Sequence, residues 1–303
     1  MIVDFHCHLS VPGSFLPETD GQYYKTVLPV TQVGQILEHV TRDAVDMLSE
    51  SWRTPAAIRT YRTVGPVIYT EMARRLMSAD SGTLLSEMSQ TGVTCSVVVA
   101  IDPYIPTAAI VDVCSQLGGL LLPFCSADTT AQDPCADLSK NLKHDIYGVK
   151  FHSDLQNIPI GCKLLDELLD VLSQSGKRFL PVYLHTGNFP IYRPSDIPWE
   201  QALPLLLERY PHLTFICGHS GWDAPKAAVR AALKHNNLYL ETSWQRPRTI
   251  RRLCDILGPK RLLLGSDFPL YSQRRALKNA KSALSAAEFE CVSYSNAAKL
   301  LRL

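Results

Sequence analysis

Eight short apolar runs recur along this chain of 303 residues, and their regular spacing constrains the fold more than any other feature. Runs of Val, Ile, Leu and Phe are typical of parallel strands that are buried on both faces. From the second run to the eighth, successive starts lie 25, 28, 31, 34, 24 and 24 residues apart, which leaves room for a strand, a loop and a crossover helix. The runs cover residues 2–6, 95–102, 120–128, 148–152, 179–185, 213–219, 237–243 and 261–267.

The segments between these runs carry helical patterns, for example over residues 163–173, 199–210 and 224–235. Eight strands that alternate with helices predict a (β/α)₈ barrel, an α/β TIM barrel, rather than an open sheet. We therefore expect one domain that spans residues 1–303, with residues 285–303 as a closing helix.

The rhythm is broken once, because about ninety residues separate the first run from the second. Within this gap, residues 31–50 and 66–91 both have a helical pattern. We expect residues 10–65 to form a helical insertion over the barrel mouth, and the last helix of the gap to be the first crossover. Long insertions after barrel strands commonly cover the active site.

Composition and charge exclude several classes of protein. The formal net charge is +1 and no extended basic block is present, which argues against nucleic-acid binding. No apolar run approaches membrane-spanning length, and no signal-like segment opens the chain, so we expect no membrane association. The nine cysteines include no CxxC pair, which favours reduced thiols and a cytoplasmic location.

Polar side chains that can bind metals recur where the apolar runs end. In a parallel barrel these ends form one face, so we expect the side chains to meet at the same mouth. Imidazole and carboxylate groups are ligands for zinc and related divalent ions. His8 shares the side of His6 by strand alternation. The sequence thus predicts a metal site at this mouth, and each of the following is a potential ligand or base: His6, His8, His152, His185, His219 and Asp267.

Lys150 shares a side of its strand with His152, and the role of both is open. A lysine inside an apolar strand is costly unless it is paired or modified. Lys150 could be carbamylated and bridge two metals, act as a base of low pKa, hold a substrate carboxylate, or pair with a nearby aspartate. His152 could be a ligand, a substrate contact or a hydrogen-bonded neighbour of a ligand.

Further candidates lie in the loops after the strands. Arg193 and Arg246 could clamp a substrate carboxylate, and Trp222 could form an apolar wall of the site. Asp4 is expected on the face of His6 and His8, one step deeper, where it could orient a ligand histidine.

The motifs DFHCH, GVKFH, VYLHTG, ICGHSG, LLGSDFP and SNAAKLL occur in an order that resembles the amidohydrolase superfamily, specifically its amidohydrolase-related (amidohydrolase 2) branch of metal-dependent barrels. That branch also includes non-oxidative decarboxylases. The resemblance implies His6, His8, His185 and Asp267 as metal ligands. It makes His219 a ligand of a second metal or a catalytic acid/base.

By the same resemblance, Lys150 falls where binuclear members carry a carbamylated bridging lysine, whereas decarboxylases generally lack this lysine and use one metal. The number of ions, one or two, is therefore left open. Dimers are common in this family, so a homodimer is expected.

The leading functional hypothesis is hydrolysis of a small organic ester, lactone or amide by metal-activated water. Asp267 would take the proton of the water, and His219 would stabilise the oxyanion or move a proton. The alternative is a metal-dependent lyase that decarboxylates an unsaturated or aromatic acid. The net charge argues against a nuclease related to the TatD barrels. The non-enzymatic alternative is a barrel in which the metal has only a structural role.

Overall fold

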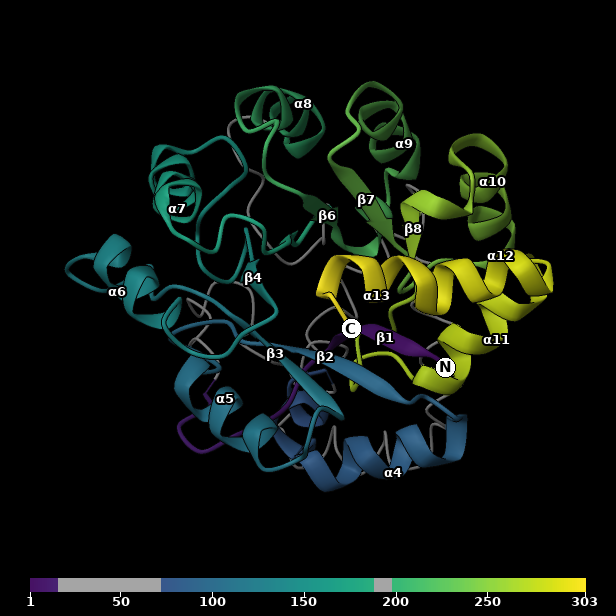
Figure 1. The fold of residues 1–303 in the computed structure, drawn as a ribbon, viewed down its shortest axis with the longest axis horizontal. Helices are drawn as coiled ribbons and strands as arrows, with labels where there is room; N and C mark the ends of the chain where they lie inside the picture. Colours follow the sequence, from purple (N-terminus) through teal and green to yellow (C-terminus); the bar gives the residue numbers. More distant parts are fainter. Residues whose placement is uncertain (16–71, 188–197) are drawn as a thin grey trace, which may run out of the picture.

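The computed structural model describes residues 1–15, 72–187 and 198–303, and its centre is an eight-stranded parallel sheet in the order β1 to β8 (Figure 1). Every predicted run overlaps one of the strands. Their bounds are β1 Val3–Cys7, β2 Cys95–Val99, β3 Leu121–Cys125, β4 Gly148–Phe151, β5 Val182–Leu184, β6 Phe215–Cys217, β7 Leu238–Glu241 and β8 Leu262–Leu263.

The sheet closes on itself where the last strand meets the first. The amide of Phe5 donates to the carbonyl of Leu264 at 2.8 Å, and the amide of Asp267 donates to the carbonyl of His6 at 2.8 Å. Cys7 and Phe268 form a parallel bridge just beyond. The predicted (β/α)₈ barrel is confirmed.

Helices connect the strands and surround the barrel (Figure 1). A helix over residues 72–78 precedes α4, which is the predicted first crossover. The predicted insertion, residues 10–65, lies outside the described residues from residue 16 onward. From α4 onward the α-helices are α4 Ser81–Thr91, α5 Thr107–Ser115, α6 Pro134–Asn141, α7 Lys163–Gln174, α8 Trp199–Arg209, α9 Pro225–Lys234, α10 Pro247–Leu257, α11 Gln273–Ala283, α12 Ala286–Glu290 and α13 Asn296–Leu301.

Helix α7 illustrates why these segments pack outside the barrel. Its buried residues are Leu165, Leu168, Leu169 and Leu172, the i, i+3, i+4, i+7 pattern of one apolar helix face. Each buried leucine stabilises the fold by about 1.5–3 kcal/mol relative to an exposed one. The leucines belong to the larger apolar cluster, which lies between the strands and the surrounding helices.

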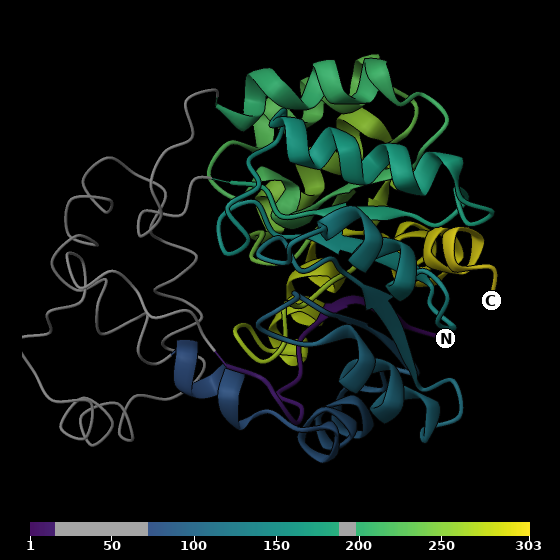
Figure 2. The same cartoon turned by 90° about the vertical axis from the view of Figure 1, so that its left-hand side faces the viewer.

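A smaller apolar cluster fills the barrel interior. It combines residues from β1 to β3 with Tyr183 of β5 and Ile216 of β6. Ala297 and Leu301 of α13 join this cluster, so the final helix covers one end of the barrel. Both chain termini lie at that end, where β1 begins, and the carboxyl ends of the strands open at the other (Figures 1 and 2).

A register shift in β1, between Asp4 and Cys7, changes which side chains face the interior. Phe5 belongs to the interior cluster and Cys7 to the outer one. The expectation that Asp4 orients a ligand ring is wrong, because its carboxylate contacts His6 at the backbone amide, at 3.3 Å, and not at the ring. It also accepts from the amide of Ser266 at 2.8 Å and from the side-chain amide of Gln273 at 2.8 Å. A β-bulge inserts one residue and so shifts the alternation of the strand.

Among the described helices, none is both long enough and apolar enough to cross a membrane.

Candidate metal centre

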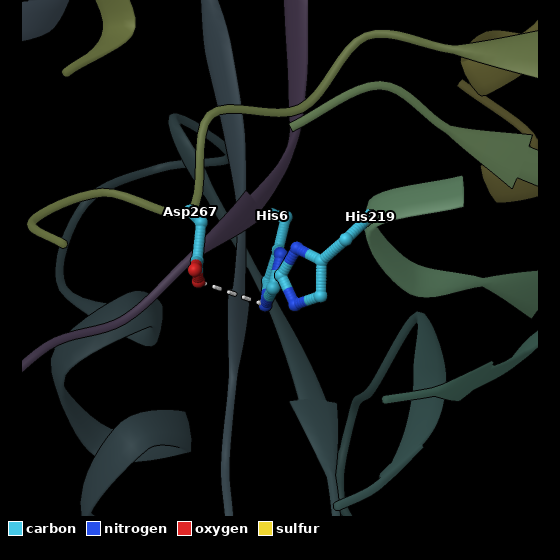
Figure 3. Close-up of side chains that lie close together, drawn as sticks. All are labelled: His6, His219 and Asp267. Carbon is cyan, nitrogen blue, oxygen red and sulfur yellow. Dashed lines mark ion pairs between the residues drawn. The ribbon is translucent and has the colours of Figure 1, made fainter. Parts of the chain in front are cut away.

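His6, His8 and Asp267 meet where β1 and β8 end. Asp267 Oδ1 lies 3.0 Å from His8 Nε2 and 3.4 Å from His6 Nε2. His219, which follows β6, completes a group with His6 and Asp267 in which the ligand atoms lie within 4.8 Å of one another. Figure 3 shows these last three side chains pointing toward one another. All four side chains are buried.

Polar atoms at this point lack ordinary partners. Among the described residues, no hydrogen bond satisfies His6 Nε2, His8 Nδ1 or Asp267 Oδ1, although all three atoms are buried. Buried polar atoms without partners cost free energy unless another group satisfies them. Imidazole nitrogens and a carboxylate oxygen are suitable ligands for a divalent ion. The residues therefore fit a metal.

The loop conformations after the last strands hold these side chains in place. Trp244 Nε1 donates to Asp267 Oδ2 at 2.6 Å, which leaves Oδ1 on the side of the histidines. Positive φ angles occur at His219 (54°), Trp244 (61°) and Asp267 (70°). Such backbone conformations are unfavourable for residues other than glycine, and they cluster at functional sites.

His185, at the end of β5, lies beside this group. Its Nδ1 is 3.2 Å from His219 Nε2, and its Nε2 is 3.5 Å from Asp154 Oδ2. A second group of potential ligands consists of His152, Asp154 and His185. The rings of His152 and His185 stack with their centres 3.8 Å apart and their planes 12° apart, so their nitrogen lone pairs lie in two separate, nearly parallel planes. The geometry of this second group is thus less suited to an ion than that of the first.

Lys150 is completely buried in β4, as expected for an interior position. Its Nζ lies 4.0 Å from the centre of the Tyr183 ring and has no hydrogen-bond partner among the described residues. Burial lowers the pKa of Lys150 to about 7, although Asp267 and Glu241 oppose the shift. Pairing with a nearby aspartate, one of the expectations for this lysine, is absent from the part of the chain that the structure describes.

Burial also controls the protonation of the histidines. It lowers the pKa of His6, His152 and His185 well below the usual value, and the positive charge of Lys150 acts in the same direction. Neutral imidazoles are the form that binds metals.

The remaining predicted substrate residues are Arg193, Arg246 and Trp222. Arg193 lies outside the described residues. Arg246 is exposed at the start of α10. Trp222 is buried in one apolar cluster with Trp244 and Tyr271, and its role as a wall of the substrate site stays a prediction.

Sequence reasoning missed three polar groups beneath the site: Tyr183, Glu241 and Ser243. Glu241 is completely buried, and burial raises its pKa to about 7. The signal was available, because Glu241 and Tyr183 are polar residues inside apolar strands, as Lys150 is. Asp154 was also missed, and it lies in a loop where the sequence offers no periodic pattern.

Three solved structures illustrate what the fold is similar to. The uncharacterized TIM-barrel protein Bb4693 from Bordetella bronchiseptica is 15% identical with a TM-score of 0.68, covering 99% of this chain and 98% of that one. The 2,6-dihydroxybenzoate decarboxylase from Rhizobium is 15% identical with a TM-score of 0.64, covering 99% and 98%.

The third is the 5-carboxyvanillate decarboxylase from Novosphingobium aromaticivorans, solved with manganese and 4-hydroxy-3-methoxy-5-nitrobenzoic acid. It is 13% identical with a TM-score of 0.64, covering 100% of this chain and 96% of that one. Identities this low show the fold alone.

None of the curated proteins matches this chain. A family model described as Amidohydrolase, by contrast, matches residues 3–303. The chain therefore belongs to the amidohydrolase superfamily, in its amidohydrolase 2 branch.

Proposed function

We propose that this protein is a metal-dependent, non-oxidative decarboxylase of a small aromatic or unsaturated carboxylic acid. Decarboxylation thereby replaces hydrolysis as the leading hypothesis. The observation that carries it is the position of His219, whose Nδ1 is anchored on Ser243 at 2.6 Å and whose ring lies within 4.8 Å of His6 and Asp267. The decarboxylases of aromatic acids with the same fold support this choice.

His6, His8 and Asp267 would hold the ion. His185, which the resemblance of the sequence implies as a further ligand, lies beside them, with its Nδ1 3.2 Å from His219 Nε2. When bound, a divalent ion would bind oxygen atoms of the substrate and stabilise negative charge that develops on them. Zinc fits these ligands, and manganese in a structural neighbour makes it an equal candidate.

His219 would act as the proton donor of the reaction. Its protonated ring would deliver a proton from Nε2 to the carbon that bears the carboxylate. The bond from that carbon to the carboxyl group then breaks, its electron pair stays on the substrate carbon, and carbon dioxide leaves. Glu241 Oε2, which lies 4.0 Å from His219 Nδ1, would stabilise the imidazolium by its negative charge.

Product analysis tests this proposal. Protein loaded with Mn²⁺ or with Zn²⁺ is incubated with a panel of hydroxybenzoic acids, and released carbon dioxide is measured. We expect release from at least one acid, its loss after chelation, and a decrease of about 100-fold or more in His219→Asn. His212→Asn is the matched control, because His212 contacts Ser173 on the protein surface. Hydrolysis of an ester or lactone, with no carbon dioxide from any acid, would refute the proposal.

Hydrolysis of a small ester, lactone or amide is the second candidate, and Lys150 is the observation that favours it. A buried amine with a pKa of about 7 and no hydrogen-bond partner among the described residues is chemically suited to react with carbon dioxide. The resulting carbamate could bridge two ions. In this reaction Asp267 would accept a proton from the attacking water. Two ions per chain, together with a carbon dioxide adduct on Lys150 in native mass spectrometry, would favour hydrolysis over decarboxylation.

A further inference from the structure

The carboxylate of Glu241 is the centre of a buried hydrogen-bond network beneath the candidate metal centre. Oε2 accepts from Tyr183 Oη at 2.7 Å, from Ser243 Oγ at 2.7 Å and from the amide of His219 at 3.1 Å. Oε1 accepts from the amide of Ser243. Because two of these donors are backbone amides, which can only donate, the carboxylate serves as an acceptor on both oxygens.

Tyr183 connects Glu241 to the ring of His6 by two hydrogen bonds. A phenol has one proton, and that of Tyr183 is donated to Glu241, so its oxygen can only accept from His6 Nδ1 at 2.8 Å. The proton of a neutral His6 must then be on Nδ1. Its Nε2 carries the lone pair and lies 3.4 Å from Asp267 Oδ1.

Ser243 connects Glu241 to the ring of His219 in the same way. Its hydroxyl proton is donated to Glu241, so its oxygen accepts from His219 Nδ1 at 2.6 Å. In a neutral His219 the lone pair is then on Nε2, the nitrogen that lies 3.2 Å from His185 Nδ1.

The backbone leaves space for this network. A Cβ atom at Gly218 would lie 2.7 Å from the ring of Tyr183, and one at Gly265 would lie 2.6 Å from Cδ of Glu241. Both distances are shorter than real Cβ contacts, so any larger residue would displace Tyr183 or Glu241.

We propose that Glu241 is a positioning residue that sets the tautomers of two histidines at once, His6 through Tyr183 and His219 through Ser243, so that both present Nε2 to the site. The proposal rests on the proposed function only for the roles of these histidines, as metal ligand and as proton donor. Groups that orient a ligand histidine typically change metal affinity by 10–100-fold. Loss of the Tyr183 contact should therefore affect the metal ligand His6, whereas loss of the Ser243 contact should affect the proton donor His219.

The first measurement needs no metal and no turnover. The ¹⁵N chemical shifts of histidine rings distinguish the two neutral tautomers, and single histidine variants assign the signals of metal-free protein. We expect protonated Nδ1 at His6 and His219. Tyr183→Phe should alter the tautomer of His6 alone, Ser243→Ala that of His219 alone, and Glu241→Gln both. Tyr239→Phe, on β7 outside the network, should alter neither.

The second measurement is the affinity for Mn²⁺. Tyr183→Phe should weaken it by about 10–100-fold, whereas Ser243→Ala should leave it within about threefold and lower kcat instead. Unchanged tautomers in Tyr183→Phe and Ser243→Ala would overturn the proposal, as would equal losses of Mn²⁺ affinity in both. If the tautomers follow the prediction but no acid is decarboxylated, the network stands and the proposed function fails.

Discussion

The barrel interior has two halves that differ in chemistry. The half built by β1 to β3 is apolar apart from His6 near the end of β1, with Val97, Val99 and Phe124 among its side chains. The half built by β4 to β7 buries Lys150 and Glu241. Burying charged groups is costly, whereas burying apolar groups stabilises the fold. The difference indicates that the first half stabilises the fold, whereas the polar groups of the second half lower the stability of the fold and serve the site.

The largest expected effect is on the apolar half. Phe124→Ala should lower the free energy of unfolding by about 3–5 kcal/mol, because it leaves a cavity beside Phe5, whose ring centre lies 5.8 Å away. Urea unfolding of metal-free protein measures this loss. If the comparison holds, the folded variant keeps its affinity for Mn²⁺. A large loss of metal affinity in folded Phe124→Ala would show that the two halves are not separable.

Asp267→Asn is the corresponding change in the site. We expect kcat/KM to decrease by more than about 100-fold, since even groups that only orient a metal ligand account for 10–100-fold. The unfolding free energy of metal-free protein should change far less than in Phe124→Ala. Steady-state kinetics and metal content per chain check this prediction, and a variant with full metal content and full activity contradicts it.

Lys150→Met tests how much a buried polar group of the second half lowers the free energy of unfolding. Replacing the buried amine by an apolar side chain should stabilise metal-free protein by about 1–4 kcal/mol while it impairs the site. Burial lowers the pKa of Lys150 to about 7 in the folded chain, from the ordinary value of 10.5 that applies to the unfolded chain. Between these values the unfolded chain binds more protons, so the cost of Lys150 decreases as the pH rises.

The stability difference between Lys150→Met and the unaltered protein should thus be largest at pH 7 and below, and should decrease toward pH 10. Urea unfolding at several pH values measures it. A difference that is constant across this range would show that the lysine is not buried as a neutral amine.

The smallest effect concerns Arg246, which is exposed and belongs to neither half. Arg246→Ala should change the unfolding free energy by less than about 0.5 kcal/mol. If Arg246 holds a substrate carboxylate, as the sequence predicts, KM rises and kcat is unchanged. An unchanged KM would remove Arg246 from the substrate site.

The fold and the meeting of polar residues at the strand ends could be predicted from the sequence, for a physical reason. Buried parallel strands are continuous apolar runs, so all eight were recognisable, and residues at their ends must share one face of a barrel. His6, His8, His219 and Asp267 come together as expected.

The parts that could not be predicted depend on neighbours in space. The register shift between Asp4 and Cys7, which separates the Asp4 side chain from the ring of His6, is a property of the pairing between β1 and β2. The role of Glu241 depends on Tyr183 and on Ser243, of which one lies 58 positions earlier in the chain. The identity and number of the ions depend on chemistry that the order of residues does not specify.

The contact between β1 and β8 has a consequence for how the protein is made. Asp4 and Ser266 are 262 positions apart, yet they are joined by hydrogen bonds, and Asp267 meets His6 beside them. Contacts between distant parts of a chain form late, because closing a long loop costs entropy. During synthesis, all the strands up to β7 can emerge before the metal centre exists. Tight metal binding would then mark the moment at which the barrel is complete.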